Sequence, residues 1–402
     1  MPLRLPSSPF HASSADGGSS KRFRQHINPL ASQFQVPKVT DLRKLVQPYA
    51  DPKLPFHVDV GCAKGTFLLE MAARHPERNF LGLEIRPLVA EFALERKAKR
   101  PHLTNLHFVA CNANVDIDQV VLAILEAESR VAAVSILFPD PHFKKQHKKR
   151  RVVTPELVSS LAAGIRAREG GPVGDETVYL ASDIQDVLDE MREVFAADAN
   201  FRDDEEEGSY LEKNPYPVAT EREGSVLDQD LPVWRSLFRL KGAEEMGGGG
   251  GATTSIEDLR AAAELKQKMR ESEQGRFLKE KGAGGGGGVD GVIIEEGANK
   301  YVLVSARDPA SQNMQIFVRS SAAAAYHREV AEPLVAELIE GGRVNVKVLG
   351  GGRINVDTAE KKVVVYGFSY AFGKADHRKA AAMIRRAEGF EDFDVTWNDE
   401  GY

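Results

Sequence analysis

The first half of the chain alternates short apolar runs with longer amphipathic segments. The apolar runs have the length and the aliphatic, β-branched character of buried strands, and they cover 56–60, 79–84, 106–111, 131–137 and 177–182. The segments between them have helical spacing and cover 66–74, 86–99, 117–126, 155–168 and 184–195. Such alternation predicts a parallel sheet with helices on both faces. A further run at 234–240 is expected to close this domain as a late strand.

The pattern changes after residue 242. Runs of five glycines at 247–251 and 284–288 are expected to behave as flexible coil. Between them, 255–281 predicts a charged, weakly amphipathic helix with Ser255 and Asp258 as capping residues. Its apolar positions are too few to build a core, so 243–288 is interpreted as a linker that tethers its neighbours loosely.

The remainder, 289–402, has the elements of an independent small domain. Apolar runs at 300–305, 344–349 and 363–366 predict strands, and 326–339 predicts a helix. Domain boundaries are therefore expected at 22–242 and 289–402, with 1–21 as a disordered leader or a short transit segment.

Composition is that of a globular protein with a charged surface. The chain has 402 residues, 42% hydrophobic and 28% charged, with a net charge of −6. Any affinity for nucleic acid must therefore come from local clusters of basic residues. Cys62 and Cys111 provide neither a disulfide framework nor a zinc motif, which favours a reducing compartment. No apolar run is long enough to span a membrane.

The turn after the first predicted strand has the chemistry of a nucleoside site. Gly61 lets a ligand approach the backbone, next to Asp59 and the start of a helix. Glu84 ends the second predicted strand, where a carboxylate can accept hydrogen bonds from ribose hydroxyls. Tight strand–helix packing would also explain the glycines. These residues alone leave both NAD and S-adenosylmethionine open.

The stretch FPDPHFKKQHKKRR at 138–151 joins a rigid carboxylate to a basic segment. Asp140 lies between Pro139 and Pro141 at the carboxyl end of a predicted strand, where open α/β sheets bind ligands. Six of the eight residues in 144–151 are Lys or Arg, which suits a polyanionic substrate. The alternatives are an Asp that satisfies its own loop and a charge run that is merely solvated.

The motifs RQHINPL, DVGCAKG, FLGLEIR, NLHFVACNAN, FPDP, HKKRR and NPYPVATERE occur in this order. Together they resemble the tRNA (guanine-N(7)-)-methyltransferase family, in particular its cyanobacterial and plastid branch. The resemblance implies a Rossmann-like S-adenosylmethionine-dependent methyltransferase domain with Asp140 as the catalytic residue. It implies cofactor binding by Asp59, Gly61, Glu84, Asn112, Ala113 and Asp140. It implies tRNA contacts by Lys144, Asp183, Thr220, Glu221, Arg222 and Glu223. His142 stands where the family usually has Trp, and an imidazole at that position can still stack on a base.

The C-terminal part carries KYVLV, LGGGRI, VYGFSYAFG and the ending VTWNDEGY, which resemble the phosphohistidine phosphatase (Janus/Ocnus) family. The resemblance implies a small α/β domain with His327 as the essential histidine. It implies phosphate binding by Lys300, Arg319, Arg353, Ser369, Tyr370 and Ala371. No acidic cluster for a metal accompanies these residues, which favours a metal-independent hydrolase. An imidazole can activate water or accept phosphoryl, and the sequence leaves both open.

The sequence therefore predicts a bifunctional fusion whose partners are tRNA and a phosphohistidine-bearing protein, without membrane or metal. Two alternatives remain: the second domain is a non-catalytic phosphate-binding module, or the first domain only binds tRNA. Chloroplast and cytoplasm are both open as compartments.

Overall fold

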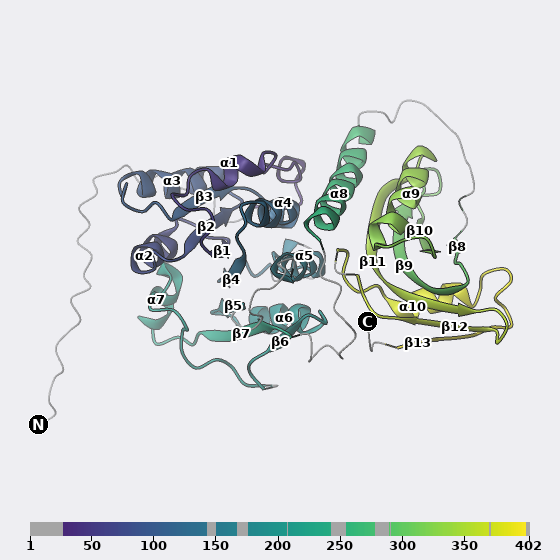
Figure 1. Ribbon diagram of the computed structural model, residues 1–402. Helices are drawn as coiled ribbons and strands as arrows, with labels where there is room; N and C mark the ends of the chain where they lie inside the picture. Colours follow the sequence, from purple (N-terminus) through teal and green to yellow (C-terminus); the bar gives the residue numbers. More distant parts are fainter. Residues whose placement is uncertain are drawn as a thin grey trace, which may run out of the picture.

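The computed structural model describes residues 27–142, 150–166, 176–206, 208–242, 255–277, 289, 291–369 and 371–398, with the backbone alone for 270–277. The described first domain is built on a seven-stranded sheet with the strand order β3-β2-β1-β4-β5-β7-β6 (Figure 1). Its strands are β1 (Phe56–Val60), β2 (Asn79–Glu84), β3 (Leu106–Ala110), β4 (Val131–Leu137), β5 (Thr177–Ser182), β6 (Phe201–Asp203) and β7 (Trp234–Leu240).

The helices of the first domain connect these strands. They are α1 (Leu42–Val46), α2 (Thr66–Arg74), α3 (Pro87–Ala98), α4 (Ala113–Glu126), α5 (Pro155–Arg166), α6 (Gln185–Ala196) and α7 (Glu221–Leu227), with a 3-10 turn, η1, at Ser32–Phe34. Strands β1 to β5 pair in parallel, and β7 pairs antiparallel with β5. The predicted doubly covered parallel sheet is confirmed. Because the strands are parallel, their carboxyl ends meet at one edge, where ligands bind in such sheets.

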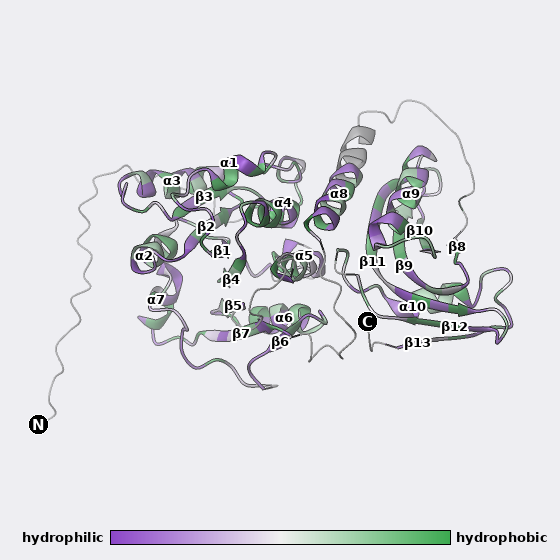
Figure 2. Cartoon of the chain, viewed as in Figure 1, coloured by the Kyte–Doolittle hydropathy of each residue, from purple (hydrophilic) through white to green (hydrophobic). Residues whose placement is uncertain are grey.

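The second domain has a six-stranded sheet with the order β13-β12-β11-β9-β10-β8 among the described residues. Its elements are β8 (Val292–Ile293), β9 (Gly297–Arg307), β10 (Met314–Ser321), α9 (His327–Glu340), β11 (Val344–Asp357), β12 (Lys362–Tyr366), α10 (His377–Ile384) and β13 (Asp394–Trp397). Each face of the sheet has its own apolar cluster, one packed under α9 and the other under α10. Figure 2 shows green, hydrophobic stretches along the strands of this domain.

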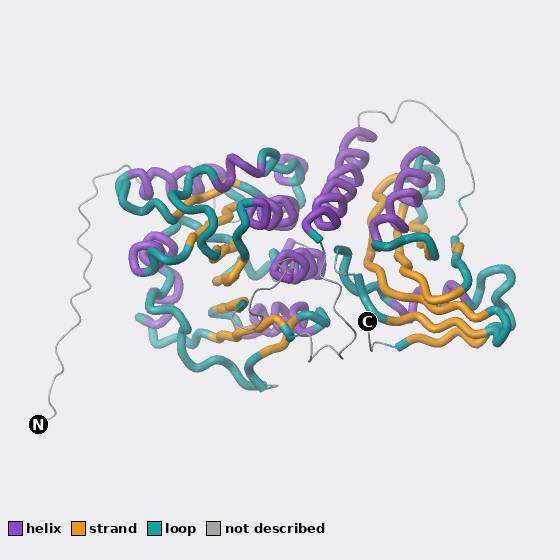
Figure 3. The backbone as a smooth tube through the Cα atoms, in the orientation of Figure 1, coloured by secondary structure: helices purple, strands orange, loops and turns teal. Residues whose placement is uncertain are grey.

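A helix joins the two domains, and it is packed rather than loosely tethered. The helix predicted at 255–281 is confirmed as α8 (Ile256–Phe277). Ile256 and Leu259 pack against the core of the first domain, while Leu265 and Met269 belong to the cluster under α9. Figure 3 shows α8 between the strands of the two domains. The interpretation as a loose linker is wrong for this helix, because few apolar residues suffice when two preformed surfaces complete the packing.

Two negative findings concern the described part of the chain. None of its helices has both the length and the apolar character that a membrane span needs. Within the same residues, His, Cys, Asp and Glu side chains form no group of three or more that could hold a metal ion.

Candidate active sites

Two buried carboxylates end adjacent strands of the first sheet. Asp59 lies in β1 and Glu84 ends β2, and they are 4% and 2% exposed. Asp59 Oδ1 accepts a hydrogen bond from Ser135 Oγ at 2.7 Å, across the β1–β4 pair. Ser135 Oγ lies 2.9 Å from Nε2 of the fully buried His57. Because the Ser135 hydroxyl donates to Asp59, it accepts from His57, which forms a chain of hydrogen bonds under the sheet edge.

Burial decides the protonation states of His57 and Asp59. It lowers the pKa of His57 to about 3, so the imidazole is neutral. It also raises the pKa of Asp59 to about 7, a shift that the nearby Glu84 increases and the Ser135 hydrogen bond opposes. The ionisation of Asp59 is therefore poised near neutral pH.

Arg86 binds Glu84 and feels the charge of Asp140. Its Nε and Nη2 donate to the two oxygens of Glu84, each at 2.9 Å, and its backbone N–H also donates to Oε1. The hydrogen bond to Glu84 is the main reason that the pKa of Arg86 is raised, and the charge of Asp140 adds to it. The charges of Glu84 and Asp140 therefore act on one guanidinium, which agrees with the ends of β2 and β4 lying at the same edge of the sheet, on either side of β1.

The turn between β1 and α2 needs glycine at two positions for different reasons. Gly61 has φ +87°, and a Cβ there would meet no atom within 4 Å. Gly65, with φ +73°, precedes α2, and a Cβ there would collide with the ring of Phe108. Gly65 thus allows close packing, whereas Gly61 leaves an open backbone surface for a ligand.

The segment 27–39, called the N-terminal arm below, covers the ends of β2 and β3. Asn112 caps α4 and donates through Nδ2 to the carbonyl of Phe34 at 3.0 Å. Asp116 accepts from the backbone N–H groups of Lys38 and Val39 at 2.7 and 2.9 Å. A hollow of about 270 Å³ lies under the arm, lined by Gln33, Phe34, Val36, Lys38, Ile85, Pro87, Ala110, Cys111 and Asn112. Ala113, the first residue of α4, is buried next to it.

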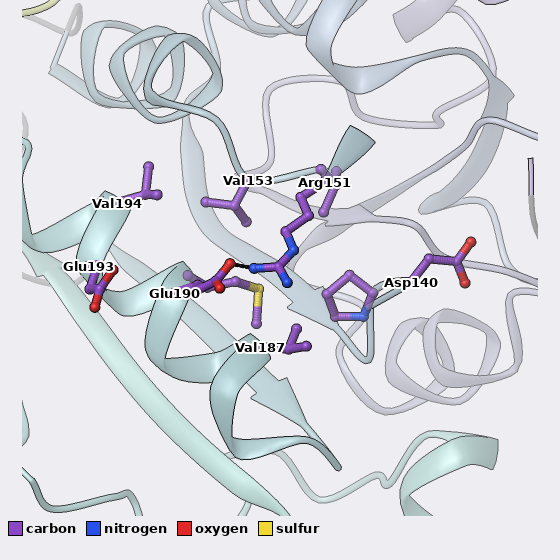
Figure 4. Close-up of a pocket in the computed structure, with 10 residues that line it drawn as sticks. Asp140, Arg151, Val153, Val187, Glu190, Glu193 and Val194 are labelled. Carbon is purple, nitrogen blue, oxygen red and sulfur yellow. Dashed lines mark ion pairs between the residues drawn. The ribbon is translucent and has the colours of Figure 1, made fainter. Parts of the chain in front are cut away.

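Asp140 is exposed beyond the end of β4. A second hollow, of about 220 Å³, lies behind it against α6. Figure 4 shows Arg151 and Glu190 paired across that hollow, with the Asp140 carboxylate directed away from them. Lys144 lies outside the described residues, as does the rest of 143–149.

The residues expected to contact tRNA divide into surface and interior groups. Asp183, after β5, forms an ion pair with Arg222 of α7. Thr220 caps α7 by accepting from the Glu223 backbone N–H, and Glu221 accepts from the Thr66 hydroxyl at 2.5 Å.

Glu223 is 2% exposed and is bound to Arg235 at 2.7 Å and to Asn214 at 2.9 Å. Its carboxylate therefore holds α7 in place from inside the domain, which does not fit the expected direct contact with tRNA.

In the second domain, three cations share one face of the sheet. Lys300 of β9 pairs directly with Arg353 of β11 and with Ser321 of β10. Arg319 lies two residues before Ser321 along β10, so its side chain is on the same face. This is the face that α9 covers, because Val302, two residues after Lys300, belongs to the cluster under α9. The fold thus gathers the expected phosphate ligands next to α9.

His327 is the first residue of α9, 6% exposed, and it lies against this face. Its Nε2 is 2.9 Å from the carbonyl oxygen of Gly352, so Nε2 carries the proton and Nδ1 has the lone pair. Burial is the main reason that its pKa falls to about 4, and the charges of Lys300 and Arg353 lower it further. The imidazole is therefore neutral at physiological pH, in a cationic surrounding.

The loop after β12 completes the second site. Ser369 is buried, and its Oγ accepts from the backbone N–H of Phe372 at 3.2 Å. Ala371 is also buried, and Tyr370 lies outside the described residues. His377 is held between the Tyr301 hydroxyl and the Gly367 carbonyl, both at 2.6 Å, so it supports the fold instead of facing the cations.

Gly351 separates His327 from Ser369, and we expect Gly351→Ala to destabilise the second domain by about 1–3 kcal/mol. A Cβ there would lie 2.8 Å from His327 Cδ2 and 3.1 Å from Ser369 Cβ. Urea unfolding measures the loss. Gly291→Ala is the matched control, because a Cβ at Gly291 meets no atom within 4 Å. Equal stability of the two variants would contradict the prediction.

The sequence analysis did not identify Ser135, His57 and Arg86, whose hydrogen bonds involve the predicted site residues Asp59 and Glu84. Ser135 and His57 are single polar residues inside the apolar strands VAAVSIL and FHVDV, and that interruption was a usable signal. Arg86 had no such signal, because an arginine two residues after a strand is common on surfaces.

Comparisons with known proteins agree with this geometry. Residues 53–236 match the family model described as "Putative methyltransferase", and residues 287–394 match the Janus/Ocnus family (Ocnus). A tRNA (guanine-N(7)-)-methyltransferase of Synechococcus elongatus is 47% identical over 218 residues, which are 54% of this chain and 95% of that protein. The same enzyme of Thermosynechococcus vestitus is 46% identical over 220 residues, 54% of this chain and 94% of that protein.

Among solved structures, that of the 16S rRNA methyltransferase KamB covers 52% of this chain and 96% of its own, at 16% identity and a TM-score of 0.31. An overlap of that size adds nothing to the assignment, which depends on the sequence relatives. Since this chain covers nearly all of those relatives, it belongs to the tRNA (guanine-N(7)-)-methyltransferase family and carries a Janus/Ocnus domain behind the methyltransferase domain.

Proposed function

We propose that the first domain transfers a methyl group to N(7) of a guanosine in the variable loop of tRNA. The observation that carries this proposal is the gathering of Asp59, Glu84 and Asp140 at the carboxyl edge of one parallel sheet. The relatives that share nearly their full length with this chain bear the name of that activity. The cofactor is S-adenosyl-L-methionine, which supplies an electrophilic methyl group on a sulfonium centre.

The residues present fit this cofactor. Gly61 has an open backbone surface, and Asp59 and Glu84 are carboxylates suited to the amino group and to the ribose hydroxyls. The oxygens of Glu84 already accept from Arg86, but a carboxylate oxygen can accept more than one hydrogen bond. Asn112 and Ala113 would line the adenine end, under the arm.

Guanine N(7) carries a lone pair, so the reaction needs alignment more than a strong base. Asp140 is held by two prolines at the end of β4, with its carboxylate exposed for a base. It would accept from the N–H edge of guanine and stabilise the positive charge that develops on the purine. Lys144, Asp183, Thr220, Glu221 and Arg222 would bind the tRNA, while Glu223 would position Thr220, Glu221 and Arg222 through α7.

Incubation of the full-length protein with unmodified tRNA and methyl-labelled cofactor tests this function. Nucleoside analysis should recover the label in 7-methylguanosine. Label in adenosine, or no label in the tRNA, would contradict the proposal.

The affinity for S-adenosylmethionine should rise as pH increases through about 7. Ionisation of Asp59, whose pKa is raised to about 7, creates the carboxylate that attracts the cationic amino group. Ser135→Ala removes the hydrogen bond that favours the ionised form, so the midpoint should move to higher pH and affinity at pH 7 should fall about three- to tenfold. Calorimetric titration from pH 6 to 8 measures both effects. A midpoint that Ser135→Ala leaves unchanged would exclude Ser135 as a control on Asp59.

We propose that the second domain hydrolyses phosphohistidine. Its support is the neutral His327 beside Lys300, Arg319 and Arg353 on one face of the sheet, together with the Janus/Ocnus match. Those cations would bind the phosphoryl oxygens, and Ser369, Tyr370 and Ala371 would supply further donors. The Nδ1 lone pair of His327 would accept a proton from water or take the phosphoryl group.

A further inference from the structure

Helix α8 is fastened to both domains by charged contacts as well as by apolar ones. On the side of the first domain, Lys266 binds Asp118 at 3.0 Å and Arg260 binds Glu126 at 2.6 Å. On the side of the second domain, α8 packs on α9 and β11 (Figure 1). The helix is thus part of the wall around the second domain, next to the end of α9 that carries His327.

The first turn of α8 brings a carboxylate to that end. Asp258 is 7% exposed, and its Oδ1 accepts from Arg328 Nε at 3.1 Å. Arg328 directly follows His327 and also lies 3.9 Å from Glu329. One guanidinium, on the residue after His327, therefore faces two carboxylates.

The charges of the same carboxylates act on Lys300 of the second site. Burial and Arg353 lower the pKa of Lys300, whereas the charges of Glu329 and Asp258 act in the opposite direction. Charges of both signs therefore act at the site. Lys300, Arg319 and Arg353 lie on the sheet, whereas Asp258 and Glu329 lie in the first turns of α8 and α9.

We propose that Asp258 of α8 is a specificity-determining residue of the second site, which selects phosphohistidine in a cationic stretch of sequence. This inference depends on the proposed hydrolysis by the second domain. The phosphoryl group would meet the cations on the sheet, while the flanking residues would lie in the field of the carboxylates, because the buried Asp258 acts through its charge and not by contact. Lys or Arg beside the phosphohistidine is attracted there, and Asp or Glu is repelled. Inorganic phosphate, which has only negative charge, is also disfavoured.

The test uses the full-length protein and two synthetic phosphohistidine peptides, one flanked by lysines and one by glutamates. We expect kcat/KM to favour the lysine peptide about tenfold, and Asp258→Asn to reduce this ratio to about threefold. Asp258→Glu keeps the charge and should keep the ratio. Glu257→Gln removes the same charge from the exposed neighbouring residue and should also keep it. If Asp258 only held α8 in place, Asp258→Asn would change kcat/KM for both peptides by the same factor.

Two results would overturn the inference: equal kcat/KM for the two peptides in the unaltered protein, or an unchanged ratio in Asp258→Asn. Binding of inorganic phosphate, measured by calorimetry, tests the inference about Asp258 independently of the proposed hydrolysis. If neither peptide is hydrolysed, the hydrolysis is wrong, yet Asp258→Asn should still bind phosphate about threefold more tightly than the unaltered protein. Equal phosphate affinity would then overturn the inference as well.

Discussion

Asp140→Asn is expected to lower kcat for tRNA methylation about 100-fold, the loss typical of one preorganised electrostatic group. The substitution keeps the size of the side chain but removes the charge that would stabilise the methylated purine. It also turns one acceptor into a donor, which opposes the N–H edge of guanine. Single-turnover transfer of labelled methyl to tRNA measures the effect, with the label identified as 7-methylguanosine.

Glu128→Gln is the matched control for Asp140→Asn. Glu128 is an exposed carboxylate that precedes β4, at the opposite end of the strand from Asp140, and it pairs with Lys53. Its loss should leave methylation unchanged within about twofold, because exposed ion pairs contribute little. If Asp140→Asn retains a rate within about threefold of the unaltered protein, Asp140 is a loop residue and not part of the chemistry.

His327→Ala is expected to slow hydrolysis of a phosphohistidine peptide at least about 100-fold, the typical contribution of a positioned acid–base group. Lys300 and Arg353 remain, so binding of inorganic phosphate should change far less than turnover. Release of phosphate and its binding by calorimetry measure the two quantities. Equal turnover by both proteins would remove His327 from the reaction, and no turnover by the unaltered protein would favour a non-catalytic phosphate-binding module.

The acid limit of this activity follows from the same histidine. The pKa of His327 in the folded protein is about 4, below its ordinary value of 6.5. Catalysis through the Nδ1 lone pair should therefore persist at pH 5 and fall as pH drops through about 4. The neutral imidazole also contributes stability that is present above pH 6.5 and is lost as pH falls toward 4. Rates of peptide hydrolysis and thermal unfolding measured between pH 4 and 7 test whether activity and stability both fall with pH as expected.

Much of the fold could be predicted because the relevant signals are local. The predicted strands of the first domain and α2 agree with the observed bounds to within one residue, since alternating and helical spacing depends on neighbouring residues alone. In the second domain the predictions at 300–305 and 344–349 cover only parts of β9 and β11. Asp59, Glu84 and Asp140 could be grouped because parallel strands end at one edge. Weakly patterned elements such as β6, β8 and β13 were not predicted, because short edge strands lack a periodic signal.

Local pattern did not determine which distant residues meet. Ser135 and Asp59 are 76 positions apart, and Arg328 and Asp258 are 70 apart. Both pairs arise because packing of strands or helices brings their backbones together, and it also buried Glu223 against Arg235. The sequence by itself determined two α/β domains and predicted a site in each. Only the tertiary structure decided that α8 packs between them with Asp258 bound to Arg328, the residue after His327, because that position depends on two surfaces that exist only after the domains have folded.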